Sequence, residues 1–151
     1  MARKKRVVAT RRSRVSESQS IDPERLLLDT HVWLWWQADD RRLGRAARHA
    51  IATAAEVRFS AASAWEISIK SALGKLKLPR GADIEAELRR DGFEPLAVEI
   101  AHAVSVLKLP AIHRDPFDRM LVAQASVEGL RLVTADVSLG RYGVSILSAV
   151  E

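Results

Sequence analysis

The sequence predicts an α/β domain with a central parallel β-sheet that is covered by helices on both faces. Short apolar runs alternate along the chain with helical patterns, as strands and helices do in such folds. The first of these runs, Leu26-Leu27-Leu28, has no polar position to turn toward solvent. A strand of this kind is typical of the middle of a parallel sheet, where both faces of the strand are buried.

Length and charge indicate one folded domain behind a basic segment. At 151 residues, 48% of them hydrophobic, the chain is large enough for a core of its own. Residues 1–24 carry seven Lys/Arg against three Asp/Glu, whereas the other residues carry 17 against 16. We therefore expect a basic, disordered arm over residues 1–24 and the folded domain over residues 25–151. An unstructured leader or an upstream start site is the interpretation that we favour for the arm, and attraction of nucleic acid is the alternative.

The composition also limits the compartment. The sequence contains no cysteine, which excludes disulfides and thiolate metal sites and is typical of a reducing environment. Its longest apolar runs fall far short of the roughly 18–20 residues that a membrane-spanning helix needs. We therefore expect a soluble, cytoplasmic protein.

Strands and helices alternate along the whole of residues 25–151. The expected order is strand 26–29, helices 31–37 and 43–55, strand 57–60, helices 64–73 and 83–90, strand 93–98, helices 99–107 and 116–128, and strands 130–134 and 144–147. Ser63 and Pro116 stand where two of these helices begin. Gly74, Gly92 and Gly129 stand where three of them end.

The helical segments differ in character. Residues 31–37 are apolar nearly all round, residues 43–55 are rich in Ala and Arg, and residues 83–90 form a charged amphipathic pattern. In the segment 64–73, an apolar residue recurs at every fourth position. These patterns place helices between successive strands, as a parallel sheet requires.

Two carboxylates follow apolar strands at the point where each strand ends. Asp29 comes after Leu26-Leu27-Leu28, and Asp136 follows the strand at 130–134. Ligands of open α/β sheets bind at the carboxyl ends of the strands, so the two acids are expected to face each other across a crevice. Each is also well placed to cap a following helix, and for Asp29 the two interpretations have equal weight.

Further acids stand near the beginnings of two helices. Glu66 is favoured there by the helix dipole and is spaced for an ion pair with Lys70. Asp115 at the N-cap, with Pro116 and Asp118 behind it, makes a well-built helix start. We interpret Asp115 as structural and Asp118 as functional.

A metal site follows if Asp29, Glu66, Asp118 and Asp136 converge. Two carboxylates about 4 Å apart repel each other by roughly 4 kcal/mol at an effective dielectric constant near 20, so protons or cations must neutralise them. Oxygen-only sites select Mg²⁺ or Mn²⁺. Such an ion activates water and stabilises the charge of an in-line attack on a phosphodiester. Thr30 and Thr134 stand beside two of the acids and can hydrogen-bond carboxylates, metal-bound water or substrate.

Four stretches that contain the acids resemble the motifs of a known protein family. The stretches Leu26-Leu27-Leu28-Asp29-Thr30-His31-Val32-Trp33, Ser63-Ala64-Trp65-Glu66-Ile67, His113-Arg114-Asp115-Pro116-Phe117-Asp118-Arg119-Met120-Leu121 and Leu132-Val133-Thr134-Ala135-Asp136 resemble the motifs of PIN-domain ribonucleases. More narrowly, they are similar to the VapC-type toxins of bacterial toxin–antitoxin pairs. The similarity spans residues 25–147, with the motifs in the right order, and relatives usually begin just before the first strand.

The resemblance implies a three-layer α/β/α domain that cleaves RNA internally with Mg²⁺ or Mn²⁺. It also implies a homodimer and a cognate antitoxin packed near the site. By position, Asp29, Glu66, Asp118 and Asp136 match the catalytic, metal-binding acids of the family, and Asp115 matches a recurrent acid that is a less certain metal ligand.

Other side chains are candidates for substrate or partner contacts. Thr30, Thr134, Arg114 and Arg119 are the candidate substrate-binding residues, and Trp33 and Trp36 are the candidates for a partner interface. His113 is expected to be a solvent-exposed loop residue.

Three other classes of protein share single features with this sequence. A phosphotransferase of the haloacid-dehalogenase kind needs a second Asp two positions after Asp29, where this chain has His31. A dinucleotide-binding domain needs a Gly-rich turn after the first strand, which is absent here. A PIN-like module that binds RNA or protein without cutting stays open as the alternative, although a decayed domain would be expected to have lost some of the acids.

Overall fold

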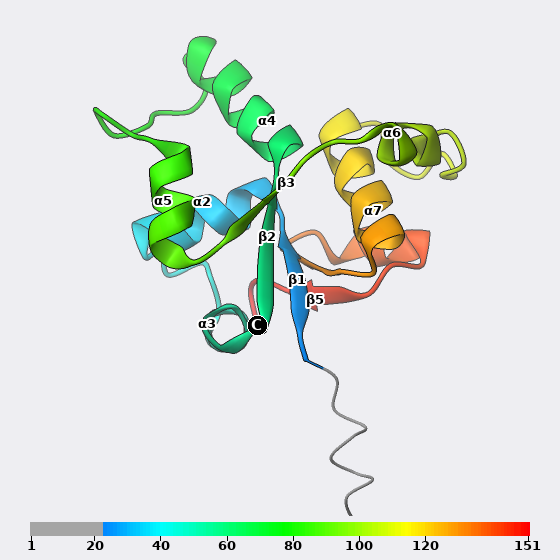
Figure 1. The fold of residues 1–151 in the computed structure, drawn as a ribbon, viewed down its shortest axis with the longest axis horizontal. Coiled ribbons are helices and arrows are strands. Elements are labelled where there is room, and N and C mark those ends of the chain that lie inside the picture. The colour runs from blue at the N-terminus through cyan, green and yellow to red at the C-terminus, as the bar shows by residue number, and fades with distance from the viewer. Residues whose placement is uncertain (1–22) are drawn as a thin grey trace, which may run out of the picture.

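A single parallel sheet lies at the centre of the domain (Figure 1). The computed structural model describes residues 23–151, and in these residues the sheet has five strands, β1 (Arg25–Leu28), β2 (Glu56–Ser60), β3 (Glu94–Leu96), β4 (Arg131–Thr134) and β5 (Ile146–Ser148). Their order is β3-β2-β1-β4-β5, and every neighbouring pair is parallel. The predicted α/β class is confirmed, while the prediction of an arm concerns mostly residues 1–22, which lie outside the described range.

Helices cover both faces of this sheet, which makes three layers. They are α2 (Thr30–Ala38), α3 (Arg45–Thr53), α4 (Ala61–Ala72), α5 (Ile84–Asp91), α6 (Ile100–Val106), α7 (Pro116–Glu128) and the 3₁₀ helix η2 (Val137–Tyr142). In Figure 1, α2, α3 and α5 lie on one side of the sheet and α6 and α7 on the other. Helix α4 rises from the edge at which the strands end.

The position of β1 in the middle of the sheet explains its three consecutive leucines. All three are fully buried, and their side chains alternate between the two faces of the sheet. Leu26 and Leu28 belong to the core under α2 and α3, which also contains Trp33 and Phe59. Leu27 belongs to the core under α7 on the opposite face. β1 is therefore a strand buried on both faces, as predicted.

The start of α4 differs from the prediction. Ser60, the last residue of β2, caps this helix by accepting a hydrogen bond from the Ala62 amide at 2.9 Å. The helix therefore begins at Ala61, directly after the strand, and the predicted cap Ser63 is a buried residue inside it. Glu66 consequently lies beyond the first turn, so its predicted place near the start of the helix was wrong. Sequence spacing could not separate two serines three residues apart, because both stand before the same apolar pattern. The start of α7 at Pro116, with Asp115 as its cap, is confirmed.

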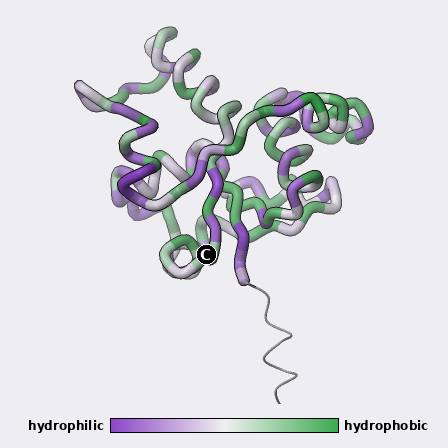
Figure 2. Tube along the Cα trace, viewed as in Figure 1, coloured by the Kyte–Doolittle hydropathy of each residue, from purple (hydrophilic) through white to green (hydrophobic). Residues whose placement is uncertain are grey.

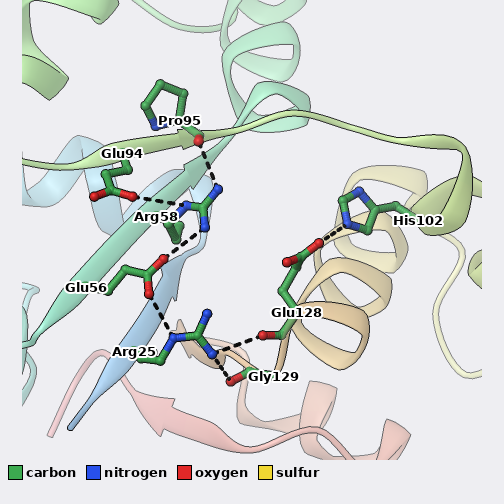
Figure 3. Close-up of polar contacts among 8 residues, drawn as sticks. All are labelled: Arg25, Glu56, Arg58, Glu94, Pro95, His102, Glu128 and Gly129. Atoms are coloured by element: carbon green, nitrogen blue, oxygen red, sulfur yellow. Dashed lines mark hydrogen bonds and ion pairs between the residues drawn. The ribbon is translucent and has the colours of Figure 1, made fainter.

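Polar contacts tie the strands to the end of α7 (Figure 3). Glu56 on β2 accepts from Arg25 on β1 at 2.8 Å and from Arg58 at 2.9 Å. These hydrogen bonds, first that from Arg25, lower the pKa of Glu56. The Arg25 guanidinium also donates to the carbonyl oxygens of Glu128 and Gly129, at 3.1 and 3.3 Å. The network fixes β1, β2 and α7 relative to one another at the end of the sheet opposite to the predicted acids.

The hydropathy of the outer helices varies between the two sides of the domain. Figure 2 shows that α5 is mostly hydrophilic and that α6 is mostly hydrophobic. In residues 23–151, no helix is both long and apolar enough to cross a membrane.

Candidate active site

The four predicted acids come from four different elements. Asp29 follows β1, Asp136 follows β4, Glu66 lies on α4, and Asp118 lies in the first turn of α7. Because β1 and β4 are neighbours in the sheet, the first two acids leave the same edge side by side. The amide of Asp29 donates to the carbonyl of Val133 at 3.0 Å, which continues the pairing of the two strands to the acid itself.

Thr134 links the two acids at the strand ends. Its hydroxyl donates to Asp29 Oδ2 at 2.7 Å and accepts a hydrogen bond from the Asp136 amide at 3.0 Å. Asp29 occupies the N-cap position of α2, but its side chain makes no capping hydrogen bond. Of the two interpretations of Asp29, the structure therefore rejects the cap. Burial raises the pKa of this carboxyl, the Thr134 hydrogen bond opposes that rise, and the negative charge of Glu66 adds to it.

Glu66 is buried and both of its oxygens have partners. Oε1 accepts from the Thr30 hydroxyl at 2.7 Å, and Oε2 lies 2.7 Å from the Lys70 ammonium. The Thr30 hydroxyl also lies 2.8 Å from that of Ser63, which is buried. The predicted ion pair between Glu66 and Lys70 is thus present, and it is the strongest cause of a raised pKa for Lys70.

The charges of all the other acids at this edge affect the pKa of Asp118. Its pKa is raised to about 7, first by burial and then by the negative charges of Asp29, Asp115, Glu66 and Asp136, in that order. Charges act on one another over several ångströms, so the effect places these carboxylates in one region at the carboxyl edge of the sheet. The structure therefore brings together the four acids that the sequence predicts, together with Asp115.

Asp115 has the structural role that was predicted for it. Its Oδ1 accepts hydrogen bonds from the amides of Phe117 and Asp118, at 2.8 and 3.4 Å. The side chain is exposed and contributes charge to the cluster from its rim.

Asp136 is held by its own turn and by a histidine. It accepts hydrogen bonds from the Ser138 amide, at 3.1 Å, and from the Ser138 hydroxyl. His113 Nε2 lies 3.4 Å from Asp136 Oδ2 and 3.0 Å from the Ser138 hydroxyl. The hydrogen bond from Ser138 and, to a smaller extent, His113 lower the pKa of Asp136. His113 is half-buried, so its prediction as a solvent-exposed loop residue was wrong; no spacing in the sequence links it to the turn of Asp136.

The donor set suits a hard cation, although the carboxylates are not arranged as a finished cage. In the part of the chain that the structure describes, no three His, Asp or Glu side chains lie close enough together to hold a metal ion as they stand. Instead, Glu66 pairs with Lys70, Asp136 accepts from Ser138, and Asp29 accepts from Thr134. The set nevertheless consists of oxygen ligands with an excess of negative charge, which is the chemistry that Mg²⁺ and Mn²⁺ prefer.

Most of the residues predicted to contact substrate have hydrogen-bond partners within the protein. Thr30 and Thr134 are buried and donate to Glu66 and Asp29, which confirms their contact with carboxylates, while their contact with substrate stays a prediction. Arg119 donates to the carbonyls of residues 106, 109, 110 and 113 and to the hydroxyl of Tyr142. It holds the loop before α7, which gives it a structural role, and its contact with substrate stays a prediction. Arg114 is exposed and stays a candidate.

The two tryptophans predicted to contact a partner lie in different surroundings. Trp33 is 2% exposed, and its ring packs on Phe59 with centroids 4.9 Å apart. It is a core residue, which corrects its assignment to a partner interface. Trp36 is partly buried against Phe93, with centroids 5.8 Å apart, and its contact with a partner stays a prediction.

The raised pKa of Asp118 predicts a stabilising substitution. Between the ordinary carboxyl value and about 7, the unfolded chain has released this proton while the folded protein retains it, so stability falls as the pH rises. In metal-free buffer with chelator, Asp118→Asn is expected to raise the free energy of unfolding by about 1–3 kcal/mol at about pH 8, and by much less near pH 4. Urea unfolding at the two pH values measures this.

The matched control is Asp39→Asn, because the side chain of Asp39 is 89% exposed and pairs only with Arg48 among the residues described. Its effect is expected to stay within about 0.5 kcal/mol. Equal stability of wild type and Asp118→Asn at the higher pH would contradict the convergence of charge on Asp118.

Comparisons with known proteins agree with this geometry. The profile of the PIN domain family matches residues 26–144. The chain is 31% identical over 112 residues to Ribonuclease VapC22 of Mycobacterium tuberculosis, which covers 74% of this chain and 86% of that protein.

Solved structures share the fold at lower identity. The crystal structure of VapBC2 from Rickettsia felis bound to a DNA fragment from their promoter matches with a TM-score of 0.63 and 12% identity, over 82% of this chain and 97% of that one. DNA-bound VapBC from Salmonella typhimurium matches with a TM-score of 0.60 and 15% identity, over 83% of this chain and 98% of that one. The resemblance drawn from the acidic motifs is thereby confirmed, and the chain belongs to the PIN domain family.

Proposed function

We propose that the protein is a metal-dependent endoribonuclease that hydrolyses RNA phosphodiester bonds in the cytoplasm as the toxin of a toxin–antitoxin pair. The observation that carries this proposal is that Asp29, Glu66 and Asp136 lie close enough to Asp118, at the carboxyl edge of the sheet, for their charges to raise its pKa. A relative that is 31% identical is named a ribonuclease, which supports the same reaction here.

The four carboxylates are the residues that would hold Mg²⁺ or Mn²⁺, with Asp115 as a less certain member. When bound, the ion lowers the pKa of a water molecule and neutralises the charge that develops on the attacked phosphate. Asp118 is the carboxyl that would release a proton to admit a cation, because its pKa of about 7 is set in part by its negative neighbours.

The chain's own contacts orient this set. Thr134 fixes one oxygen of Asp29, and Thr30 with Lys70 fixes both oxygens of Glu66. Glu66 either joins the cation site or accepts a hydrogen bond from the attacking water, which would leave that water aligned with the phosphorus. The attack is made by water, so no covalent intermediate with the protein forms.

A cognate antitoxin is the proposed protein partner. Structural neighbours with TM-scores of 0.63 and 0.60 are named as VapBC proteins, and another is named a toxin–antitoxin complex. A groove of about 530 Å³ runs between α2 and the segment that links α4 to α5, and it is lined by apolar side chains such as Trp35, Leu78 and Ile84. Its lining includes His31, whose charge acts on Asp29, so a segment bound there would pass close to the acids.

A second copy of the chain is the proposed occupant of another apolar surface. Trp65 is 64% exposed on α4 and lies edge-on to Phe117 on α7, with ring centroids 5.6 Å apart. Together with Val98 and Met120, they line a cavity of about 480 Å³. Exposed aromatic surface of this kind marks protein interfaces, and a two-fold dimer buries the same patch on both subunits.

The decisive test of the nuclease is cleavage of a mixed RNA pool with Mg²⁺ or Mn²⁺ and, separately, with chelator. Asp29→Asn keeps the size of the side chain and removes one charge from the cluster, so its rate is expected to fall by about 100-fold or more. Asp39→Asn, on the exposed end of α2, is the matched control and should cut like wild type.

Robust cleavage by Asp29→Asn, or cleavage in chelator, would contradict the proposed mechanism. Absence of cleavage by wild type on any RNA, combined with retained RNA binding, would favour the alternative function, a PIN-like module that binds without cutting.

The proposed dimer has a test of its own. Sedimentation equilibrium of Trp65→Ser is expected to show association at least about 10-fold weaker than that of wild type, because the substitution removes the largest exposed apolar side chain of the patch. Leu73→Ser, at the far end of α4 and 63% exposed, is the control and should associate normally. A monomeric wild type, or equal association of both variants, would exclude this surface as the dimer interface.

A further inference from the structure

The turn that ends α4 joins the backbones of two lysines at positions where such turns often carry an apolar pair. The amide of Lys75 donates to the carbonyl of Lys70 at 2.8 Å, and the amide of Gly74 donates to that of Ser71 at 3.1 Å. Gly74 has a φ of +72°, so the turn is a Schellman motif. In this motif the two residues joined by the hydrogen bond that spans more of the chain, here Lys75 and Lys70, often form a hydrophobic contact. Here both are lysines.

These lysines line a pocket beside the acids. Thr30, His31 and Leu34 of α2 form one wall of it, Ile67 and Lys70 of α4 form another, and Lys75 and Leu76 of the turn close it. The pocket has a volume of about 240 Å³. Since a water molecule occupies about 30 Å³, the pocket has room for a phosphate group with part of its hydration shell.

The charge of the pocket is positive and only partly compensated. Lys70 pairs with Glu66 at 2.7 Å, whereas Lys75 is exposed and forms no ion pair with any residue in 23–151. The His31 side chain is exposed at the same pocket. An anion bound here would be attracted by both ammonium groups, of which only that of Lys70 has a carboxylate partner among the described residues.

The position of the pocket identifies the anion. Glu66 contacts two of its lining residues, Thr30 and Lys70, so the pocket adjoins the acid cluster directly. A nucleic-acid strand that places one phosphate at the cluster must place the next phosphate nearby, and the carboxylates repel that phosphate. A neighbouring cationic pocket offsets this repulsion.

We propose that this pocket, with Lys70 and Lys75 as its cationic groups, binds the RNA phosphate that flanks the phosphate under attack. This inference rests on the proposed endoribonuclease function and adds a backbone subsite to it. Lys75 is the residue that reports on the subsite alone, because Lys70 also orients Glu66.

The test is the salt dependence of RNA binding in chelator, where no cleavage occurs. The probe is a fluorescent single-stranded RNA of mixed sequence, about 20 nucleotides long, followed by anisotropy. Loss of one phosphate contact is expected to reduce the slope of log K against log salt by about 0.7 in Lys75→Gln and to weaken binding several-fold at low salt. Lys75→Arg should restore most of the slope. Lys108→Gln, which removes an exposed lysine between α6 and α7, is the matched control and should match wild type.

The outcomes distinguish failure of the proposed subsite from failure of the proposed nuclease function. A reduced slope in Lys75→Gln supports the subsite even if the RNA pool is not cut, in which case the nuclease proposal alone fails. Wild-type slopes in Lys75→Gln, an equal loss in Lys108→Gln, or no RNA binding by wild type would overturn the subsite. The subsite would also be overturned if Lys75→Gln weakened binding of an acidic partner peptide and left RNA binding unchanged.

Discussion

Repulsion among the carboxylates at the edge of the sheet is the constraint on which the rest of the site depends. Two carboxylates about 4 Å apart repel each other by roughly 4 kcal/mol at an effective dielectric constant near 20. The protein limits this repulsion by giving each acid a partner. Thr134 donates to Asp29, Lys70 pairs with Glu66, Ser138 donates to Asp136, and Asp118 retains a proton up to about pH 7.

The fold supplies a rigid base for this charged edge. β1 is buried on both faces, and its pairing with β4 sets Asp29 beside Asp136. β2 runs directly into α4, so Glu66 projects from a helix that is anchored in the sheet. Side chains on strands and helices are held more precisely than side chains on loops, which suits a site in which the acids must remain close despite their charge.

Much of this arrangement can be predicted from the sequence, because it follows from local patterns. Consecutive leucines predicted the central strand, and acids placed after strands or at helix starts predicted the cluster. Contacts between segments far apart in the chain could not be predicted from such patterns. Arg119 looked like a substrate contact because it is cationic and lies near the site, yet its partners are backbone carbonyls of a folded-back loop. A helix that is apolar nearly all round likewise cannot reveal that Trp33 faces the core.

We propose that these carboxylates act as one cation site whose charge is balanced by the proton on Asp118. The most direct measurement is calorimetry of Mn²⁺ binding to the metal-free protein in two buffers with different ionisation enthalpies. At about pH 7, binding should release about half a proton, since Asp118 is then half-protonated, and Asp118→Asn should abolish this release and weaken binding. Equal proton release by wild type and Asp118→Asn, or no Mn²⁺ binding to wild type, would contradict the account.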